Sequence, residues 1–188
     1  WVFLHGCSDA NEVWNGIERQ DLHRSVAIHE MNKQAMAMAG WSVDDIDIFD
    51  LYSCFPSAVE VACQEMGIAE DDPRPFTVTG GLPYFGGAGN AYTLMSVATM
   101  MQKLRATPGA KGLCNGNGWF LTKHSLGLYS TTPVDGEWQR QAPSVLQAQI
   151  DAGPTRAYDE FPSGEGWIES YTVAHVPGRD PLGILIGR

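Results

Sequence analysis

The sequence contains no apolar run close to the ~20 residues that a membrane-spanning helix needs, and no cysteine spacing typical of a disulfide framework or a zinc site. Its four cysteines, Cys7, Cys54, Cys63 and Cys114, are scattered without a C-x-x-C pair. The five histidines form no H-x-x-x-H pattern. We therefore expect a soluble, cytoplasmic protein with reduced thiols, no structural metal and no membrane association.

Basic residues are also few, since 12 Lys and Arg stand against 22 Asp and Glu, for a formal net charge of −10. A general nucleic-acid binder needs a basic footprint, so this class of protein is excluded as a first hypothesis. With 188 residues, of which 44% are hydrophobic and 18% charged, the chain can bury a core of ordinary domain size. It begins within the apolar run "WVFLHG", which leads us to expect a piece of a longer protein.

No phosphate-binding motif is complete, because neither G-x-x-x-x-G-K-[ST] nor an intact G-x-G-x-x-G is present. Glycines nevertheless cluster at positions 80, 81, 86, 87 and 89, directly before an apolar helical stretch. Three interpretations of this glycine loop stay open. It could bind an anion at the helix N-terminus near Asn90, carry a reactive group between two elements, or serve only as a tight connection.

Strands and helices are predicted to alternate over the first 130 residues, as in α/β layered proteins. Gly40 and Gly67 are expected to end the first two helices, and Pro56 to begin the second. The sequence "NGNG" at 115–118 is expected to form a turn between two strands. The predicted strands are 1–6, 46–52, 76–81, and two within 112–130; the predicted helices are 22–40, 56–67 and 89–109.

Composition changes after Tyr129, where "STTPVDGEW" resembles a linker. A weak helix is expected over 139–153, followed by strands within 155–161, 166–176 and 181–188. We therefore divide the chain into an α/β domain, residues 1–130, and a small β-rich module of OB-like type, residues 131–188, which need not be complete.

Two groups of residues are candidates for chemistry. Cys114 ends a predicted strand before the expected glycine turn, and His124 lies on the following strand, so the two could meet across a hairpin. The alternative is a small buried cysteine and a structural histidine. Cys54 lies in "LYSCFPS", where a strand passes into a helix, and the carboxyl ends of strands line active crevices in α/β folds.

Three segments, in this order, resemble the C-terminal half of the thiolase superfamily. They are "DLYSCFPSAVEV", "GGLPYFGGAGNAYTLMSVA" and "GLCNGNGWFLTKHSLGLY". The nearest branch is the acetyl-CoA acetyltransferase-like one with an additional small C-terminal β domain, which "WIESYTVAHV … PLGILIGR" resembles. The resemblance implies a layered αβα unit with a mixed sheet, followed by the β-rich module. The helix after the glycine loop has no acids between Gly89 and Lys103, which suits a helix packed between two sheets.

The resemblance also implies an acyltransferase of lipid metabolism that uses a coenzyme A ester as substrate and holds no tightly bound cofactor. Its acyl-accepting cysteine would belong to an N-terminal half of the same protein, outside this chain. The expected partners are acyl-CoA, that N-terminal half and a second copy of the chain, because an uncovered sheet face would favour self-association.

Cys114 matches the acid/base cysteine of the family's C-x-G motif, with Asn115 and Gly116 completing it. The histidine of the family's G-H-P loop is absent, because Gly86, Gly87 and Ala88 stand there, and the asparagine of its N-E-A-F segment falls at or near Ala58. An oxyanion donor is worth about 3 kcal/mol in the transition state, so other groups would have to substitute. The resulting expected site comprises Cys114 and His124 as catalytic residues and, as substrate-binding residues, Tyr52, Ala58, Tyr84, Gly86, Gly87, Asn90, Asn115 and Gly116.

Two further functions stay open. One is a non-catalytic acyl-CoA-binding or scaffold protein, which the missing histidine and asparagine favour. The other is a retro-aldol lyase acting on a CoA ester, with Tyr52 or Tyr84 as the acid/base group.

Overall fold

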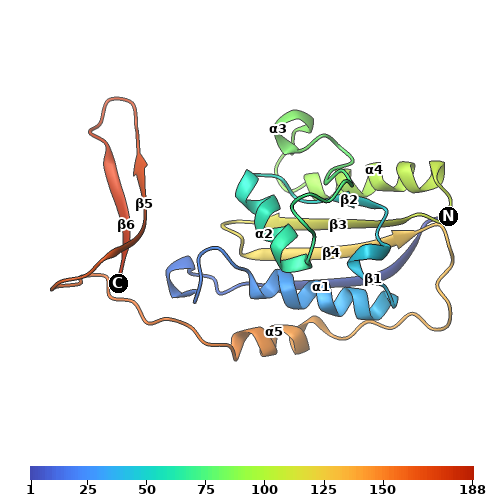
Figure 1. Cartoon of the computed structure of the whole chain (residues 1–188), viewed down its shortest axis with the longest axis horizontal. Coiled ribbons are helices and arrows are strands. Elements are labelled where there is room, and N and C mark those ends of the chain that lie inside the picture. Colours follow the sequence, from blue (N-terminus) through green and yellow to red (C-terminus); the bar gives the residue numbers. More distant parts are fainter.

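The computed structural model describes residues 1–188 and contains a four-stranded mixed sheet with helices on both faces (Figure 1). The strand order is β1-β4-β3-β2, with β2 parallel to β3 and the other two pairings antiparallel. This is the layered α/β unit with a mixed sheet that the sequence predicted. The strands are β1 (Phe3–Asn11), β2 (Ile48–Asp50), β3 (Lys111–Gly118) and β4 (Lys123–Ser130).

Three long helices cover this sheet, and their ends follow local sequence signals. The Ser25 hydroxyl accepts a hydrogen bond from the Ile28 N–H and caps α1. Gly40 and Gly67, both in the left-handed conformation, end α1 and α2 as expected, and Pro56 begins α2. The helices of the α/β unit are α1 (Val26–Ala39), α2 (Pro56–Met66), the short α3 (Leu82–Phe85), α4 (Tyr92–Ala106) and two 3₁₀ turns, Gly16–Glu18 and Val43–Asp45.

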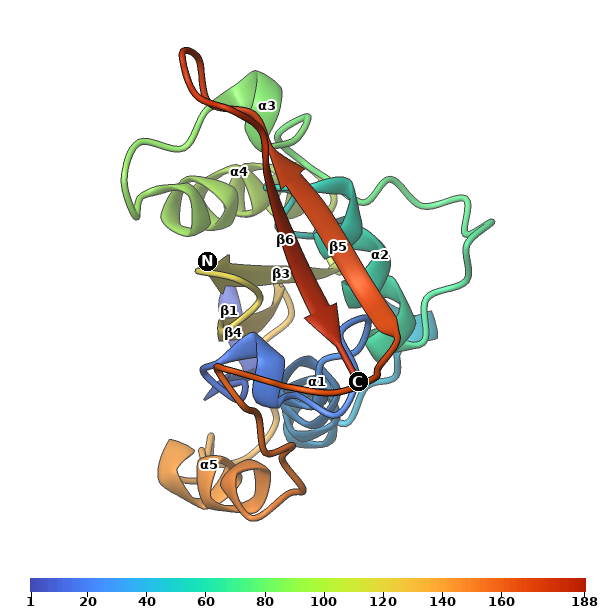
Figure 2. The same cartoon turned by 90° about the vertical axis from the view of Figure 1, so that its left-hand side faces the viewer.

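Alternation along β3 separates two cores. Leu113 packs with α1 and α2 in the larger core, together with Leu126 and Leu128 of β4. Cys114 points to the other face, where it packs against Met100 and Leu104 of α4. In Figure 2, α4 accordingly lies on the side of the sheet opposite to α1 and α2.

Two local predictions for the four-stranded sheet were wrong. Residues 115–118, "NGNG", lie inside β3, and the turn to β4 is made by residues 119–122. The predicted strand at 76–81 is absent, although the Leu51 N–H still donates to the Phe76 carbonyl at 2.8 Å. Beyond that bond the segment bonds to the Asp50 side chain instead of to a neighbouring backbone, so no regular ladder forms.

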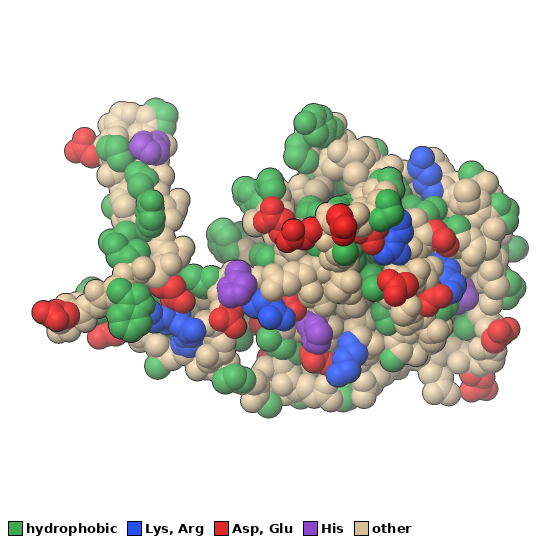
Figure 3. All heavy atoms as spheres, viewed as in Figure 1, with side chains coloured by type: hydrophobic (Ala, Val, Ile, Leu, Met, Phe, Trp, Pro, Cys, Tyr) green, Lys and Arg blue, Asp and Glu red, His purple; other side chains and the backbone are tan.

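The C-terminal segment contains α5 (Pro143–Asp151) and a hairpin of β5 (Ile168–Ala174) and β6 (Leu182–Gly187). The hairpin projects away from the α/β unit and presents apolar side chains to solvent (Figures 1 and 3). The predicted strand within 155–161 is absent. Leu146 and Ile150 of α5 belong to the larger core of the α/β unit. The domain division at residue 130 stays a prediction, but this packing groups α5 with the α/β unit rather than with the hairpin.

No helix in the structure combines the length and the apolar character needed to cross a bilayer.

Candidate functional site

A buried carboxylate connects the end of β2 to the glycine loop and to α4. Asp50 is fully buried, and its Oδ1 accepts hydrogen bonds from the Thr77 hydroxyl and the Val78 N–H, both at 2.9 Å. Its Oδ2 accepts a hydrogen bond from the Tyr92 hydroxyl at 3.2 Å. Tyr92 is itself 1% exposed, and burial raises its pKa to about 12. Asp50 therefore fixes where the glycine loop begins, a role that the sequence analysis missed; its place at the end of a strand was the available signal.

The glycine loop itself is largely exposed. Gly80 and Gly81 have φ values of 94° and 92°, which non-glycine residues rarely adopt, and the Leu82 N–H donates to the Ser53 hydroxyl at 3.1 Å. Tyr84 of α3 is 90% exposed. Gly86, Gly87 and Asn90 are exposed as well.

Cys114 is buried in the middle of β3 rather than exposed at a turn. It is 2% exposed, and burial raises the pKa of its thiol to about 12. The predicted exposure was wrong because the following Asn-Gly-Asn-Gly residues continue the strand. In the described arrangement the thiol is a protonated core group.

His124 does not face Cys114. In the β3–β4 pairing His124 is opposite Asn117, while Cys114 is opposite Gly127. Paired residues share a face of a sheet and alternate residues change face, so His124 and Cys114 point to opposite sides. His124 is 4% exposed, and burial lowers its pKa to about 4. The predicted meeting of these two side chains across the hairpin is therefore wrong.

The side chains that do converge lie at the carboxyl ends of β2 and β3. The Tyr52 N–H donates to Asn115 Oδ1 at 2.7 Å, and Asn117 Nδ2 donates to Cys54 Sγ at 3.6 Å. Cys54 is partly exposed, so its thiol, unlike that of Cys114, can be reached from solvent. Burial raises the pKa of Tyr52, with a smaller contribution from the neighbouring Cys54. Asn117 was missed because it was assigned to a turn.

The remaining predicted residues support this end of the sheet in different ways. Ala58 is 4% exposed in the first turn of α2 and offers no polar group. Gly116 allows α4 to approach closely, because a Cβ there would come within 2.8 Å of the Thr93 hydroxyl. Beside Gly116 is a polar hollow of about 220 Å³, lined by Thr93, Gly116, Asn117, Gly118, Lys123, His124 and Ser125.

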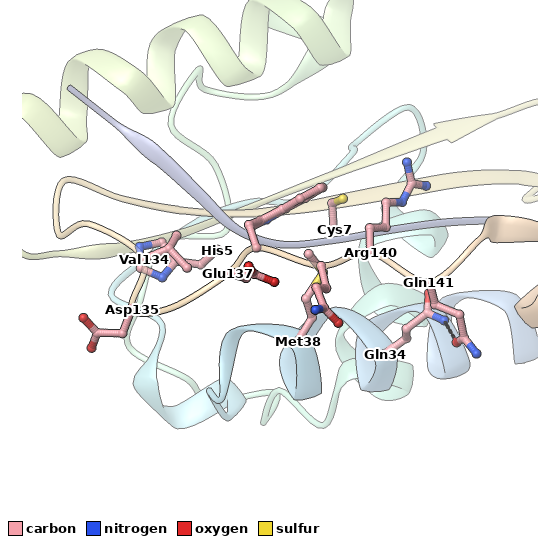
Figure 4. Close-up of a pocket in the computed structure, with 11 residues that line it drawn as sticks. His5, Cys7, Gln34, Met38, Val134, Asp135, Glu137, Arg140 and Gln141 are labelled. Atoms are coloured by element: carbon pink, nitrogen blue, oxygen red, sulfur yellow. Dashed lines mark hydrogen bonds between the residues drawn. The ribbon is translucent and has the colours of Figure 1, made fainter.

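A different cavity, of about 530 Å³, lies between β1, α1 and residues 134–141 (Figure 4). It contains none of the predicted site residues. Its strongest polar groups already have partners: Arg140 pairs with Asp9, and the Gln34 amide donates to Gln141 at 2.8 Å. It is therefore separate from the candidate site at the ends of β2 and β3.

Comparison with known proteins shows which proteins the chain is related to. The sequence is 30% identical over 89 residues to the cytosolic acetyl-CoA acetyltransferases of Rattus norvegicus and Mus musculus. The whole chain superposes on a monomeric SCP2-thiolase-like protein type 1 from Mycobacterium smegmatis with a TM-score of 0.91 and 43% identity. The chain is a homologue of the thiolases. No protein-family model matches the sequence.

This thiolase-like chain spans only part of each relative. The aligned segment is 46% of the chain and 22% of the rat and mouse proteins, and the chain covers 41% of the mycobacterial protein. Peroxisomal 3-ketoacyl-CoA thiolase of Saccharomyces cerevisiae has the same fold over 68% of the chain, with a TM-score of 0.51 and 15% identity. That enzyme is a five-layered α-β-α-β-α structure built from two core domains of identical topology, and the chain covers 34% of it.

Proposed function

We propose that the chain is the C-terminal half of an acyl-CoA-handling protein of acetyl-CoA acetyltransferase type, with altered catalytic residues, that acts in the cytoplasm and in lipid metabolism. The observation that carries this proposal is the homology to acetyl-CoA acetyltransferases, combined with polar side chains that converge at the carboxyl ends of β2 and β3. No tightly bound cofactor is required, because the CoA ester is the substrate.

The thioester would lie between the glycine loop and the ends of β2 and β3. Among the chain's thiols, Cys54 is the better acid/base candidate, because it is partly exposed and receives a hydrogen bond from Asn117. Tyr52 and Asn90 remain candidate substrate-binding groups, and an N-terminal half of the same protein would supply the acyl-accepting cysteine.

Non-catalytic acyl-CoA binding is the second candidate. The burial of Cys114 favours it, because the family's acid/base position is then occupied by a protonated thiol without access to solvent. In this case the pocket would hold the ester without turning it over.

Calorimetric titration of the chain with acetyl-CoA tests the proposal. We expect saturable binding, which is weakened by Asn117→Leu and unchanged by Phe161→Ala, a change at an 85% exposed aromatic residue in the C-terminal segment. Absence of saturable binding up to about millimolar acetyl-CoA would contradict the proposal. Turnover of the ester that depends on Cys54 would decide against the non-catalytic alternative.

A further inference from the structure

The turn between β3 and β4 contains two non-glycine residues in the left-handed conformation. Trp119 has a φ of 56° and Leu121 a φ of 52°. Bulky residues adopt this conformation only when their surroundings impose it, and such strain is concentrated at functional sites. Local sequence preference does not explain the shape of this turn, so contacts with the rest of the structure must impose it.

Arg19 supplies the constraint through its guanidinium group. Its Nη1 donates to the Phe120 carbonyl and its Nη2 to the Thr122 hydroxyl, both at 3.0 Å. Its Nε donates to the Val13 carbonyl at 2.9 Å, and the residue is only 8% exposed. Burial lowers the pKa of Arg19, which the nearby Glu12 carboxylate opposes. A buried guanidinium is thus used to fix an exposed turn.

The constraint directs large aromatic rings into solvent. Leu121 packs against the larger core, whereas Trp119 is 66% and Phe120 83% exposed. The two rings are parallel within 8°, with centroids 6.0 Å apart. They form an exposed apolar pair of the kind that marks a binding site rather than a folding need.

We propose that Trp119 and Phe120 form a wall that receives the apolar part of an acyl group longer than acetyl, and that Arg19 is the positioning residue for this wall. The inference rests on the proposed function. Trp119 directly follows β3 and is two residues beyond Asn117, the residue that contacts Cys54. A thioester held at Cys54 would therefore bring its acyl chain, and not its distant nucleotide, within reach of the aromatic rings.

Chain-length dependence tests the wall. We would titrate the chain with acetyl-CoA, octanoyl-CoA and the octanoyl thioester of N-acetylcysteamine, which lacks the nucleotide. Each methylene that leaves water strengthens binding roughly fourfold, so octanoyl-CoA should bind at least about tenfold more tightly than acetyl-CoA even with partial burial. Trp119→Ala with Phe120→Ala should abolish that ratio without changing acetyl-CoA binding, and Phe161→Ala is the matched control.

The variants at Arg19 separate positioning from stability. Arg19→Lys retains the charge but cannot make the forked hydrogen bonds, so we expect a reduced chain-length ratio in protein that still melts cooperatively. If that variant does not fold, Thr122→Val, which removes one of the two acceptors in the turn, is measured instead.

The outcomes distinguish the two ideas. Equal binding of both CoA esters, or a chain-length ratio that survives the double alanine variant, overturns the wall and leaves the proposed function standing. Octanoyl-thioester binding that depends on Trp119, without any contribution from the CoA moiety, supports the wall and contradicts the CoA-binding function. Binding of none of the three probes overturns both.

Discussion

His124 is a buried side chain whose two ring nitrogens have no partner of hydrogen-bonding geometry. Its lowered pKa, about 4, means that the folded state excludes a proton which the unfolded chain binds below pH about 6.5. The unfolded state therefore binds more protons between those values, and stability is lost as the pH falls through this window, by up to about 1.4 kcal/mol per pH unit.

We expect His124→Phe to stabilise the chain, because it removes unsatisfied polar atoms, by about 1 kcal/mol near neutral pH. The gain should be larger at about pH 5, where the wild-type histidine opposes folding. Urea unfolding at the two pH values measures both effects, with the exposed His23→Phe as the control. A gain that is the same at both pH values would contradict the role assigned to His124.

Thiol chemistry gives a second prediction for single residues. Burial raises the pKa of Cys114 from its ordinary value of 9.0 to about 12, which lowers its thiolate fraction near neutral pH by about three orders of magnitude. Cys7 and Cys54 are partly exposed, whereas Cys63 is buried and its pKa is also raised by burial. Rapid alkylation by iodoacetamide should be confined to Cys7 and Cys54.

Peptide mapping after brief labelling checks this distribution. Cys54→Ser should remove one of the two rapidly labelled sites, while Cys114→Ser should leave the rapid phase unchanged. Fast modification of Cys114 in the native chain would show that the thiol is accessible, and would restore it as the acid/base candidate.

At the level of elements, the contact between α1 and β1 depends on a missing side chain. A Cβ on Gly6 would overlap the backbone carbonyl of Ala35, and a backbone atom cannot move aside as a flexible side chain can. We expect Gly6→Ala to destabilise the chain by about 2–3 kcal/mol, as overpacking of a rigid contact does. Gly16→Ala, where a Cβ meets nothing within 4 Å, is the control and should change the free energy of unfolding by less than about 0.5 kcal/mol in urea titrations.

Helices α1, α2, α4 and α5 and the two strands of the terminal hairpin could be predicted from the sequence because their signals are local, whereas the short helix α3 was not predicted. Helical periodicity, Pro56 and the C-terminal glycines of α1 and α2 act within one or two turns of chain. The β3–β4 turn could not be predicted, because Trp119 and Leu121 adopt left-handed conformations through hydrogen bonds from Arg19, about 100 positions away in the sequence.

The misplaced β3–β4 turn also explains why the expected contact between His124 and Cys114 was wrong. Moving the turn from "NGNG" to residues 119–122 fixes the register of β4, and register decides which side chains share a face. His124 thereby lies opposite Asn117 and away from Cys114. The resemblance to the thiolases could be predicted from the sequence. The face of the sheet to which each side chain points could not, because it depends on how the strands pair.

At the level of the whole molecule, apolar surface is left uncovered on the outer side of α4. Leu94 is 73% and Met95 37% exposed, although the opposite side of α4 is packed on the sheet. The yeast thiolase of the same fold has five layers made from two core domains, and the related mycobacterial protein, of which the chain covers 41%, is monomeric. An intramolecular cover for α4 in the longer proteins is consistent with both descriptions.

Without such a cover, the chain should self-associate through α4, because contiguous exposed apolar surface is unfavourable in water. We expect sedimentation velocity to show a concentration-dependent increase in mass for the 188-residue chain. Leu94→Glu with Met95→Glu should shift the population to monomer, since association would bury two carboxylates without partners. Val26→Glu, a change at a 55% exposed position on α1, is the control and should leave association unchanged. If Ile184→Glu on β6 abolishes association and the α4 variant does not, the apolar hairpin, and not α4, is the surface that requires a partner.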